Sequence, residues 1–447
     1  MLDRLLERLP AEPRRTLVLL GILALVAALF RFPGLAYPGE EYFDEVYHAK
    51  TALQYLRGEP PTEWVHPPTA KLLIAIPVAL FGYEPWAWRL APALAGMFLA
   101  PVFFLLARRA LATERAALLA TLLLLLDGVY LVQSRVAMTN VFAVLFQLLA
   151  ALLLLRAATE ERLRLGAMVA LGVALGLALS TRWTSLFAWG FLGLVFLALR
   201  GTRLGRERLS GLVRSRGLLE RGDAERLGGL LWRELALAGL AFAVVPATVY
   251  LLAYVPWMRQ GHTPWEVVTL QKAIWRYHAD LTATHNYFSR WWTWPWLYRP
   301  TWYFWWSGEG VVRGIVAIGN PAVWWASVPV AAWAAWTGVR WRDPRRLFAG
   351  AGFFCLYVPW GLSPRTLNFS HYLFEAIPYA CLALGIFLDR AWDGRHPLLP
   401  RGYVVLATIL FFLFLPFLTA MPVPMSLWGY RFPIFGGGIW TWFPTWV

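Results

Sequence analysis

Hydrophobic stretches of membrane-spanning length recur along the whole chain, and they limit what it can fold into. A helix needs about 20 apolar residues to cross the roughly 30 Å hydrocarbon core of a bilayer. The composition agrees, since 59% of the 447 residues are hydrophobic and 15% are charged. We therefore predict an all-α polytopic membrane protein with about eleven transmembrane helices, near residues 15–31, 87–107, 111–126, 139–156, 165–180, 184–200, 234–255, 315–338, 346–361, 371–389 and 402–420.

Basic residues between these spans orient the chain. Lys and Arg accumulate in short cytoplasmic loops, and here they lie in blocks after alternate spans. We therefore attribute the net charge of +15 to topology and not to nucleic-acid binding. The first span follows several arginines and lacks a small-residue cleavage site, so we expect a retained helix and a cytoplasmic N-terminus. An odd number of spans then places residues 421–447 on the extracytoplasmic side.

The segments between spans form parts of one expected membrane domain, residues 1–447. Segments 32–86 and 256–314 are expected on the extracytoplasmic side, and each is long enough to build a site. Residues 201–232 form a basic, Gly-rich cytoplasmic loop that we interpret as a mobile connector. Within these segments the sequence gives no disulfide framework, because the two cysteines, Cys355 and Cys381, both lie in apolar runs.

Two short helices are expected within the extracytoplasmic segments. Residues 264–278 place apolar side chains on one helical face, which is typical of a helix lying in the membrane interface. The run from Lys71 to Gly82 is too short to span a bilayer and contains Pro77, so we expect a half-buried element there.

Two carboxylates stand together after the first span, and they suggest a chemistry. Asp44 and Glu45 share their segment with His48, His66 and Lys71, in a chain that has few ionisable residues. Acids in such a loop, without a metal-ligand or nucleophile pattern, fit transfer of a sugar from a lipid phosphate. One carboxylate can deprotonate the acceptor hydroxyl, and the phosphate is already a good leaving group. A single displacement of this kind inverts the anomeric centre.

Other residue types suit the substrates of such a reaction. Cations for the phosphate are expected at outside span ends or in outside loops, at Arg135, Arg182, Lys272 and Arg365, although each could equally be a snorkelling cap. Trp291 and Trp292 belong to a tryptophan-rich run that could form an interfacial aromatic belt or stack against sugar or peptide.

Motifs in order along nearly the whole chain resemble the protein O-mannosyltransferase family, enzymes that use dolichyl or polyprenyl phosphate-mannose. The resemblance implies a GT-C glycosyltransferase fold and inverting transfer of mannose to Ser or Thr hydroxyls. It rests on Phe43-Asp44-Glu45 with His48 and Tyr55, His66-Pro67-Pro68 with Lys71, Phe81-Gly82 with Arg89, Gln133-Ser134-Arg135, Thr181-Arg182-Trp183, the run from His285 to Pro295 with Arg299-Pro300, and His371-Tyr372 with Pro378.

The resemblance also implies roles for individual residues. Asp44 would be the base, Glu45 would support the acceptor or sugar, and Arg135 would hold the lipid phosphate. No cofactor is expected to be required; Asp44, Glu45 and His48 could in principle ligate a divalent ion, but metal use is not expected. Contacts to sugar or acceptor are expected from His48, His66, Lys71, His285, Tyr287, Trp291, Trp292 and His371.

The sequence departs from the family pattern in three ways. Asn140 stands where the family often has an acid, and Arg182 replaces the usual lysine before Trp183. The third departure is that no soluble stretch matches the large luminal β-trefoil of eukaryotic relatives. The chain therefore resembles the compact bacterial branch, which implies action at the plasma membrane on acceptors exported by the Sec translocon.

Several alternatives stay open at this point. Asp44 and Glu45 could be an interfacial pair neutralised by Lys50 or Arg57, and Arg135 could be a span-end anchor. The enzyme could instead move another sugar, or modify a lipid or glycan. A transporter would place its charges in mid-span along a path, whereas here the acids cluster in a loop. The carrier length and the oligomeric state are also open.

Overall fold

The computed structural model describes residues 13–214, 231–394, 397–433 and 436–447. Its first half is helical: α2 (Arg14–Arg31), α3 (Glu45–Arg57), α4 (Thr69–Phe81), α5 (Pro85–Ala110), α6 (Glu114–Leu125), α7 (Gly128–Gln133), α8 (Asn140–Ala158), α9 (Leu165–Leu179) and α10 (Ser185–Arg214). The second half adds η1 (Leu240–Val244), α12 (Val245–Ala253), α13 (Val255–Met258), α14 (Pro264–Ala279), η2 (Trp291–Trp296), β1 (Thr301–Gly308), β2 (Val311–Ala317), α15 (Pro321–Arg340), α16 (Pro344–Tyr357), η3 (Val358–Leu362), η4 (Ser370–Glu375), α17 (Ile377–Trp392), α18 (Leu398–Leu418), β3 (Val423–Pro424), α19 (Met425–Gly429) and η5 (Pro444–Trp446).

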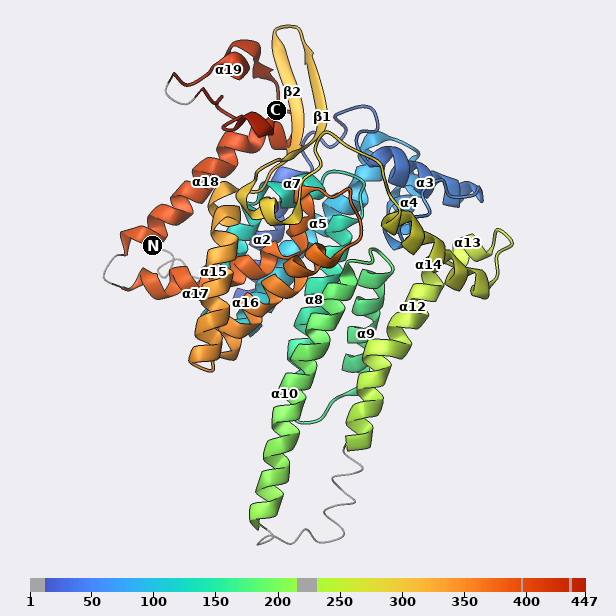
Figure 1. Ribbon diagram of the computed structural model, residues 1–447, viewed down its shortest axis with the longest axis vertical. Coiled ribbons are helices and arrows are strands. Elements are labelled where there is room, and N and C mark those ends of the chain that lie inside the picture. Colours follow the sequence, from blue (N-terminus) through green and yellow to red (C-terminus); the bar gives the residue numbers. More distant parts are fainter. Residues whose placement is uncertain (1–12, 215–230, 395–396, 434–435) are drawn as a thin grey trace.

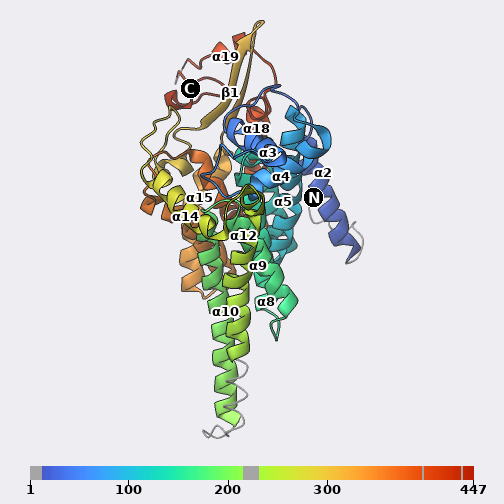
Figure 2. The same ribbon diagram turned by 90° about the vertical axis from the view of Figure 1, so that its right-hand side faces the viewer.

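The long helices form a bundle whose two ends differ. At one end α10 and the helix Leu231–Ala253 project away from the rest, as Figures 1 and 2 show. At the other end lie α3, α4, α14 and the β1–β2 hairpin, together with the C-terminus. The expected extracytoplasmic segments 32–86, 256–314 and 421–447 therefore gather at the same end of the molecule.

Small residues let the helices of the bundle approach closely. A Cβ atom at Gly172 of α9 would lie 2.7 Å from the Cβ of Val245, and one at Gly176 would lie 2.6 Å from the Cβ of Val249 in α12. In the same way, a Cβ at Gly385 of α17 would lie 2.6 Å from the carbonyl oxygen of Ala116 in α6. Close approach at small residues is the usual way in which membrane helices pack, since lipid supplies no hydrophobic drive between them.

The helical predictions agree with the structure. Each predicted span contains a helix, and residues 264–278 form α14, whose start carries a capping box between Thr263 and Glu266. Four helices are long and apolar enough to cross a membrane within the described residues, and three shorter apolar helices accompany them. The number of crossings remains a prediction.

The cytoplasmic connector begins differently from the prediction. Helix α10 continues to Arg214 instead of ending at residue 200, so the first part of the 201–232 loop is helical. Residues 215–230 of this predicted loop, like the arginines before residue 13, lie outside the described residues.

The sequence did not predict the hairpin. Strands β1 and β2 pair antiparallel, and β3 adds two residues to the free edge of β2. The turn consists of Glu309 and Gly310, both with positive φ (54° and 74°), as two-residue hairpin turns require. The predicted span at 315–338 therefore starts too early: its first residues belong to β2, and its helix, α15, begins at Pro321.

Candidate functional site

Asp44 occupies a special place in the backbone. The preceding residue, Phe43, has the left-handed φ of 52°, which is uncommon for a side chain of this size. Asp44 is the N-cap of α3, yet its side chain makes no capping hydrogen bond. Strained backbone of this kind persists where the surrounding structure holds it, and it clusters at functional sites.

The Asp44 carboxylate is half-buried and chemically available. Within the described part of the chain, no group donates a hydrogen bond to it. Burial and the nearby Glu63 carboxylate raise the pKa of Asp44 to about 6, although Arg365 and Arg182 oppose the shift. A carboxylate with this pKa is ionised at neutral pH and accepts a proton more readily than an ordinary aspartate.

Glu45 is fully buried, and its carboxylate is occupied by protein groups. Arg89 donates to both of its oxygens, at 2.9 Å from Nε and 2.8 Å from Nη2. The backbone N–H of Ala137 donates at 3.0 Å and the indole of Trp88 at 3.2 Å. Glu45 therefore joins α3, α5 and the chain after α7, and this geometry favours a positioning role over the predicted contact with acceptor or sugar.

Arg135 is likewise engaged with the protein. Its guanidinium donates to four backbone carbonyl groups at and beyond the end of α2, those of Phe30 (3.2 Å), Arg31 (2.6 Å), Pro33 (2.8 Å) and Gly34 (3.2 Å). Phe30 and Arg31 belong to the last turn of α2, whose carbonyls a helix end leaves unpaired. The geometry thus favours the span-end anchor, and it does not bring Arg135 to the other predicted phosphate ligands.

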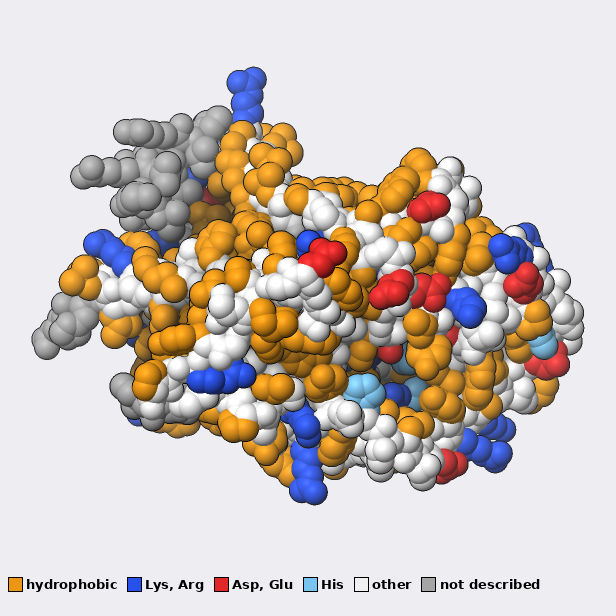
Figure 3. Space-filling model, turned by 90° about the horizontal axis from the view of Figure 1, so that it is seen from above, with side chains coloured by type: hydrophobic (Ala, Val, Ile, Leu, Met, Phe, Trp, Pro, Cys, Tyr) orange, Lys and Arg blue, Asp and Glu red, His pale blue; other side chains and the backbone are white. Residues whose placement is uncertain are grey.

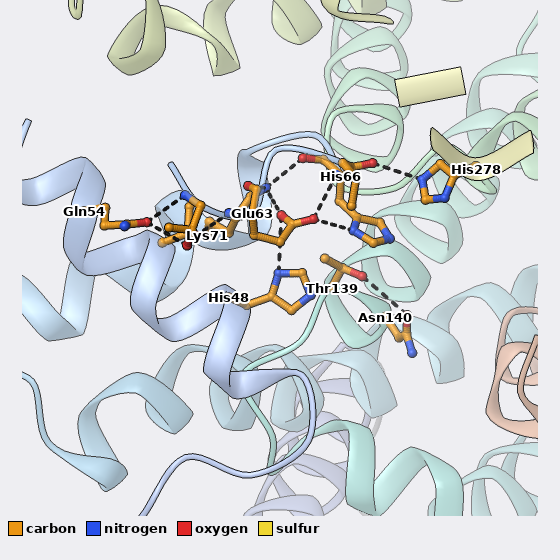
Figure 4. A network of polar contacts seen from close by, with 11 residues as sticks. His48, Gln54, Glu63, His66, Lys71, Thr139, Asn140 and His278 are labelled. Atoms are coloured by element: carbon orange, nitrogen blue, oxygen red, sulfur yellow. Dashed lines mark hydrogen bonds and ion pairs between the residues drawn. The ribbon is translucent and has the colours of Figure 1, made fainter. Parts of the chain in front are cut away.

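A buried acid that the sequence analysis missed organises the segment between α3 and α4. Figure 4 shows Glu63 surrounded by Lys71, His66 and His48. Glu63 accepts hydrogen bonds from Lys71 Nζ and from His66 Nδ1 (2.7 Å), and His48 Nδ1 lies 3.8 Å away. Its partners, Lys71 first, hold the pKa of Glu63 well below its usual value, against the effect of burial.

Lys71 and His66, both predicted contacts, have different freedom in this network. Lys71 is fully buried, and its ammonium also donates to the carbonyls of Glu63 and His66, so its donors serve the protein. Burial lowers the pKa of His66, although Glu63 opposes the shift. A neutral His66 that donates from Nδ1 to Glu63 has Nε2 free as an acceptor. The geometry therefore favours a structural role for Lys71 over the predicted contact, and it leaves one ring nitrogen of His66 without a protein partner among the described residues.

Two arginines and two histidines meet in a cavity of about 170 Å³ beside this network. Arg182 lies 4.5 Å above the ring of Tyr372, with its Nε 3.5 Å from Glu375. Arg365 donates to the carbonyl of Leu367 and contacts His278. The same cavity is lined by Arg182, Arg365, His66, His278, Trp360 and Tyr372.

The charge of this cavity is positive. Burial, together with His66 and Arg365, lowers the pKa of His278 to about 3, so this histidine is neutral at physiological pH. The guanidinium groups of Arg182 and Arg365 are the cations in the cavity lining. Lys272 is not among them, because it is exposed on α14 and lines a separate surface hollow with Trp64 and Arg276.

An aromatic cluster adjoins Asp44 through Phe43, the residue that precedes it. Phe43 stacks on Tyr303 of β1, with ring centroids 4.0 Å apart. His371 contacts both rings, at 6.1 Å from Phe43 and 5.4 Å from Tyr303, and the exposed His285 lies 6.3 Å from Phe43. Tyr287 is 5.6 Å from His285. The structure thus brings His285, Tyr287 and His371 to one aromatic cluster next to Asp44.

The two predicted tryptophans lie elsewhere. Trp292 is exposed under Arg290, and Trp291 packs on Tyr357 and against Gly361. The buried member of their run, Trp294, packs instead against Trp360 and Tyr372, two residues of the cavity wall. From above this end of the molecule, Figure 3 shows a hollow in which acidic, basic and histidine side chains lie together within a largely hydrophobic surface.

Asn140, the departure from the family pattern, is buried at the first position of α8. Its side-chain oxygen accepts a 3.4 Å hydrogen bond from Thr139, and its Nδ2 has no partner in the described structure. Figure 4 places it below His66, on the side of the network away from Lys71. Among the described residues, no group of three His, Cys, Asp or Glu side chains has the arrangement of a metal site. That the reaction requires no metal remains a prediction.

Four residues of this region escaped the sequence analysis: Glu63, His278, Tyr303 and Glu375. His278 ends the predicted interfacial helix, and its position there was the available signal. Tyr303 belongs to the hairpin, which could have been found from the Glu-Gly turn between two β-prone runs. Glu63 and Glu375 gave no signal, since nothing in a sequence shows which isolated acid becomes buried.

Comparison with known proteins agrees with the family resemblance that the sequence motifs indicated. The family described as dolichyl-phosphate-mannose-protein mannosyltransferase matches residues 21–88 and 84–258, and the C-terminal four TMM region of protein-O-mannosyltransferase matches residues 265–446. Curated proteins named polyprenol-phosphate-mannose–protein mannosyltransferase are 27% identical: the Mycolicibacterium smegmatis protein over 98% of this chain and 94% of its own, and the Mycobacterium tuberculosis protein over 98% and 93%.

A solved structure supports the fold. The S. cerevisiae protein O-mannosyltransferase Pmt1-Pmt2 complex bound to the sugar donor superposes with a TM-score of 0.74 at 15% sequence identity, covering 93% of this chain and 92% of that chain. The chain thus has the GT-C fold that the motif resemblance implied.

Proposed function

Because the chain belongs to the dolichyl-phosphate-mannose-protein mannosyltransferase family, we propose that it transfers mannose, with inversion, from a polyprenyl phosphate to Ser or Thr hydroxyls of exported proteins. The observation that carries the mechanism is the contrast at residues 44 and 45. Glu45 is held by Arg89, whereas Asp44 is accessible, has a raised pKa and lies beside a cationic cavity.

In this mechanism Asp44 is the base. The acceptor hydroxyl gives its proton to Asp44 while its oxygen forms the bond to the anomeric carbon of mannose. The bond from that carbon to the phosphate oxygen breaks, and the electron pair leaves with polyprenyl phosphate. The leaving group needs no proton because it departs as an anion, which cations nearby stabilise.

Arg182 and Arg365 are the proposed phosphate ligands. They line one cavity together with His66, while Arg135 is engaged by backbone carbonyls and Lys272 lines a separate surface hollow. Buried guanidinium groups bind phosphate oxygens through charge-assisted hydrogen bonds.

An apolar groove continues from this cavity. It has a volume of about 480 Å³ between α9, α10, α12 and α14, and it shares Trp183 and Leu186 with the cationic cavity. Its lining is almost wholly hydrophobic, with Phe242, Val267 and Leu251 among the residues. A phosphate in the cavity and an isoprenoid chain in the groove would occupy adjoining spaces of matching chemistry.

The location of the reaction is part of the proposal. The cytoplasmic N-terminus expected from the arginine blocks would put Asp44 and the hairpin end outside the plasma membrane. In support, segments 32–86, 256–314 and 421–447 gather at that one end in Figure 1. Acceptors would arrive there in extended form from the Sec translocon.

The test is a transfer assay with protein purified into lipid, labelled polyprenyl phosphate-mannose and a Ser/Thr/Pro-rich peptide. Asp44→Asn should lose about 100- to 10,000-fold or more in turnover and still bind the donor. Glu40→Gln, which neutralises an exposed acid of the same segment, is the matched control and should keep normal turnover. Near-normal transfer by Asp44→Asn would refute the assignment of the base. Transfer of the label from the donor to another lipid or to a glycan, with none on the peptide, would refute the acceptor class.

A further inference from the structure

Several buried polar atoms near Asp44 have no partner in the described structure. They are Gln133 Oε1, Ser370 Oγ and His371 Nδ1, on side chains that are each at least 99% buried. Native proteins leave few buried polar groups unpaired, and each such group calls for an explanation. Three in one neighbourhood indicate a ligand with several hydroxyl groups.

Two of these side chains, Gln133 and His371, contact Tyr303. Gln133 Nε2 donates a 2.6 Å hydrogen bond to the Tyr303 hydroxyl, which leaves the hydroxyl hydrogen free to donate. His371 lies with its ring edge-to-face against Tyr303, and Ser370 is its neighbour in η4. Tyr303 lies beside the start of α3, because Phe43, the residue before Asp44, stacks on its ring with centroids 4.0 Å apart. Burial, and then the charge of Asp44, raises the pKa of the Tyr303 hydroxyl.

The walls of this neighbourhood are aromatic. Phe43 stacks on Tyr303, and Phe369 stacks on His371 with ring planes 10° apart. A pyranose ring presents apolar C–H faces as well as hydroxyl edges, and it suits a site that combines aromatic faces with unpaired donors and acceptors.

The geometry points to Gln133, Tyr303 and His371 as the residues that read the hydroxyl groups of the transferred hexose and so set sugar specificity. This inference rests on the proposed function, because the sugar is that of the lipid donor. The hairpin thereby contributes directly to the site, since its base carries Tyr303 there from a segment more than 160 residues beyond Gln133 in sequence.

A second role for Tyr303 makes a different prediction. If its hydroxyl donated to the Asp44 carboxylate instead, it would stabilise the ionised base. Removing that hydroxyl would then raise the pKa of Asp44 and move the pH midpoint of turnover upward. A hydroxyl that reads the sugar leaves the pH midpoint in place and changes the choice among donors.

The experiment removes one hydroxyl group at a time from the sugar of the donor and compares the effect with removal of the Tyr303 hydroxyl from the enzyme. Polyprenyl phosphate carrying mannose, its 2-, 3-, 4- and 6-deoxy forms, or glucose is given to wild-type enzyme and to Tyr303→Phe, which keeps the stacked ring. We expect wild type to lose about 10- to 100-fold in kcat/KM on at least one deoxy donor. Tyr303→Phe should show a similar loss on mannose and little further loss on that same deoxy donor.

Controls separate the outcomes. Tyr298→Phe removes the hydroxyl of an exposed tyrosine from the same segment and should behave as wild type. If Tyr303→Phe lost the same factor in kcat/KM on every donor and its pH midpoint shifted, the inference would be overturned in favour of a hydrogen bond from Tyr303 to Asp44. A wild-type enzyme that loses less than about threefold on every deoxy donor would also overturn it, without any variant having to fold.

The proposed function fails in a different way. Transfer of glucose in preference to mannose, with the Tyr303 pairing intact, would correct the sugar and uphold the subsite. If no peptide is labelled, the affinity of the enzyme for each donor of the deoxy series is measured by competition instead. A deoxy donor that binds wild type more weakly than the mannose donor, but binds Tyr303→Phe equally well, upholds the subsite. Equal affinity of wild type for all donors overturns it.

Discussion

Asp44 and Glu45 are adjacent in sequence, but their carboxylates have opposite surroundings. Glu45 accepts from Arg89, Trp88 and the backbone of Ala137, whereas no described group donates to the side chain of Asp44. The turn through Phe43 at positive φ and the start of α3 separate the two directions. The carboxylate of Glu45 is therefore occupied by protein groups, whereas that of Asp44 is open to a ligand.

Glu45→Gln should destabilise the protein. The change leaves the buried Arg89 without its ionic partner, and breaking a buried pair from one side costs about 3–5 kcal/mol. Thermal unfolding in detergent measures the loss. Glu45→Gln combined with Arg89→Gln should lose less than the sum of the single changes, and simple additivity would argue against the pairing.

Turnover should rise with pH through a midpoint near 6. The Asp44 pKa is raised to about 6, and only the ionised form can accept a proton. At pH 5, one unit below this pKa, about a tenth of the activity should remain. A kcat/KM profile measures the midpoint, and a flat profile between pH 5 and 7 would contradict the role of Asp44 as base.

The raised pKa of Asp44 also makes the stability of the folded protein depend on pH. Because the folded-state pKa of Asp44 lies above the ordinary value, ionisation disfavours the folded state, and the cost appears as pH rises from about 4 through 6. Asp44→Asn should therefore melt at a higher temperature than wild type at pH 7. The difference should vanish below about pH 4, and a lower melting temperature of the variant at pH 7 would contradict this sign.

Glu63→Gln should move the activity midpoint to lower pH. Glu63 raises the pKa of Asp44 through its negative charge, so its neutralisation lowers that pKa. The change also leaves buried Lys71 without a carboxylate, which should reduce stability. The doubly substituted Glu63→Gln, Lys71→Met protein recovers part of that stability if the pair is mainly structural, and the pH midpoint is the readout that a purely structural role would not move.

Donor affinity should distinguish the arginines. Arg182→Gln and Arg365→Gln should each weaken donor binding by about 10- to 100-fold, as expected for a charge-assisted hydrogen bond to phosphate. Lys272→Gln is the matched control for charge and should bind normally. Arg135→Gln should lower thermal stability, because four carbonyl groups near the end of α2 lose their donor. A specific loss of donor affinity in Arg135→Gln, with normal stability, would restore its predicted role.

The features that the sequence predicted well are those that depend on the length of an apolar run or on a local pattern of residues. The spans follow from runs of apolar residues, and the α14 helix follows from its one-sided periodicity. The hairpin could not be recognised as a separate element, because its strands are apolar and aromatic like the tryptophan-rich segment before it and the membrane span after it. The short strand β3, which joins β2 from 110 residues further on, gives no local signal.

The structure brings some of the predicted site residues together and engages others within the fold. His66 and Arg182 line one cavity, and the charge of Arg182 acts on Asp44. Arg135, Lys71 and Glu45 are instead bonded to protein groups. A sequence shows that a cation stands at a span end, but it does not show whether backbone carbonyls lie within its reach. Only the folded structure shows which carbonyl groups surround the cation.

The cavity of Arg182 and Arg365 has a consequence for the pace of the catalytic cycle. Before transfer the phosphate is a diester with one negative charge, and afterwards it is a monoester that carries more. If Arg182 and Arg365 bind the phosphate as proposed, the same two guanidinium groups hold the spent carrier more tightly than the loaded one. The spent carrier would then compete with each new donor for the cavity, so that accumulated polyprenyl phosphate would inhibit transfer.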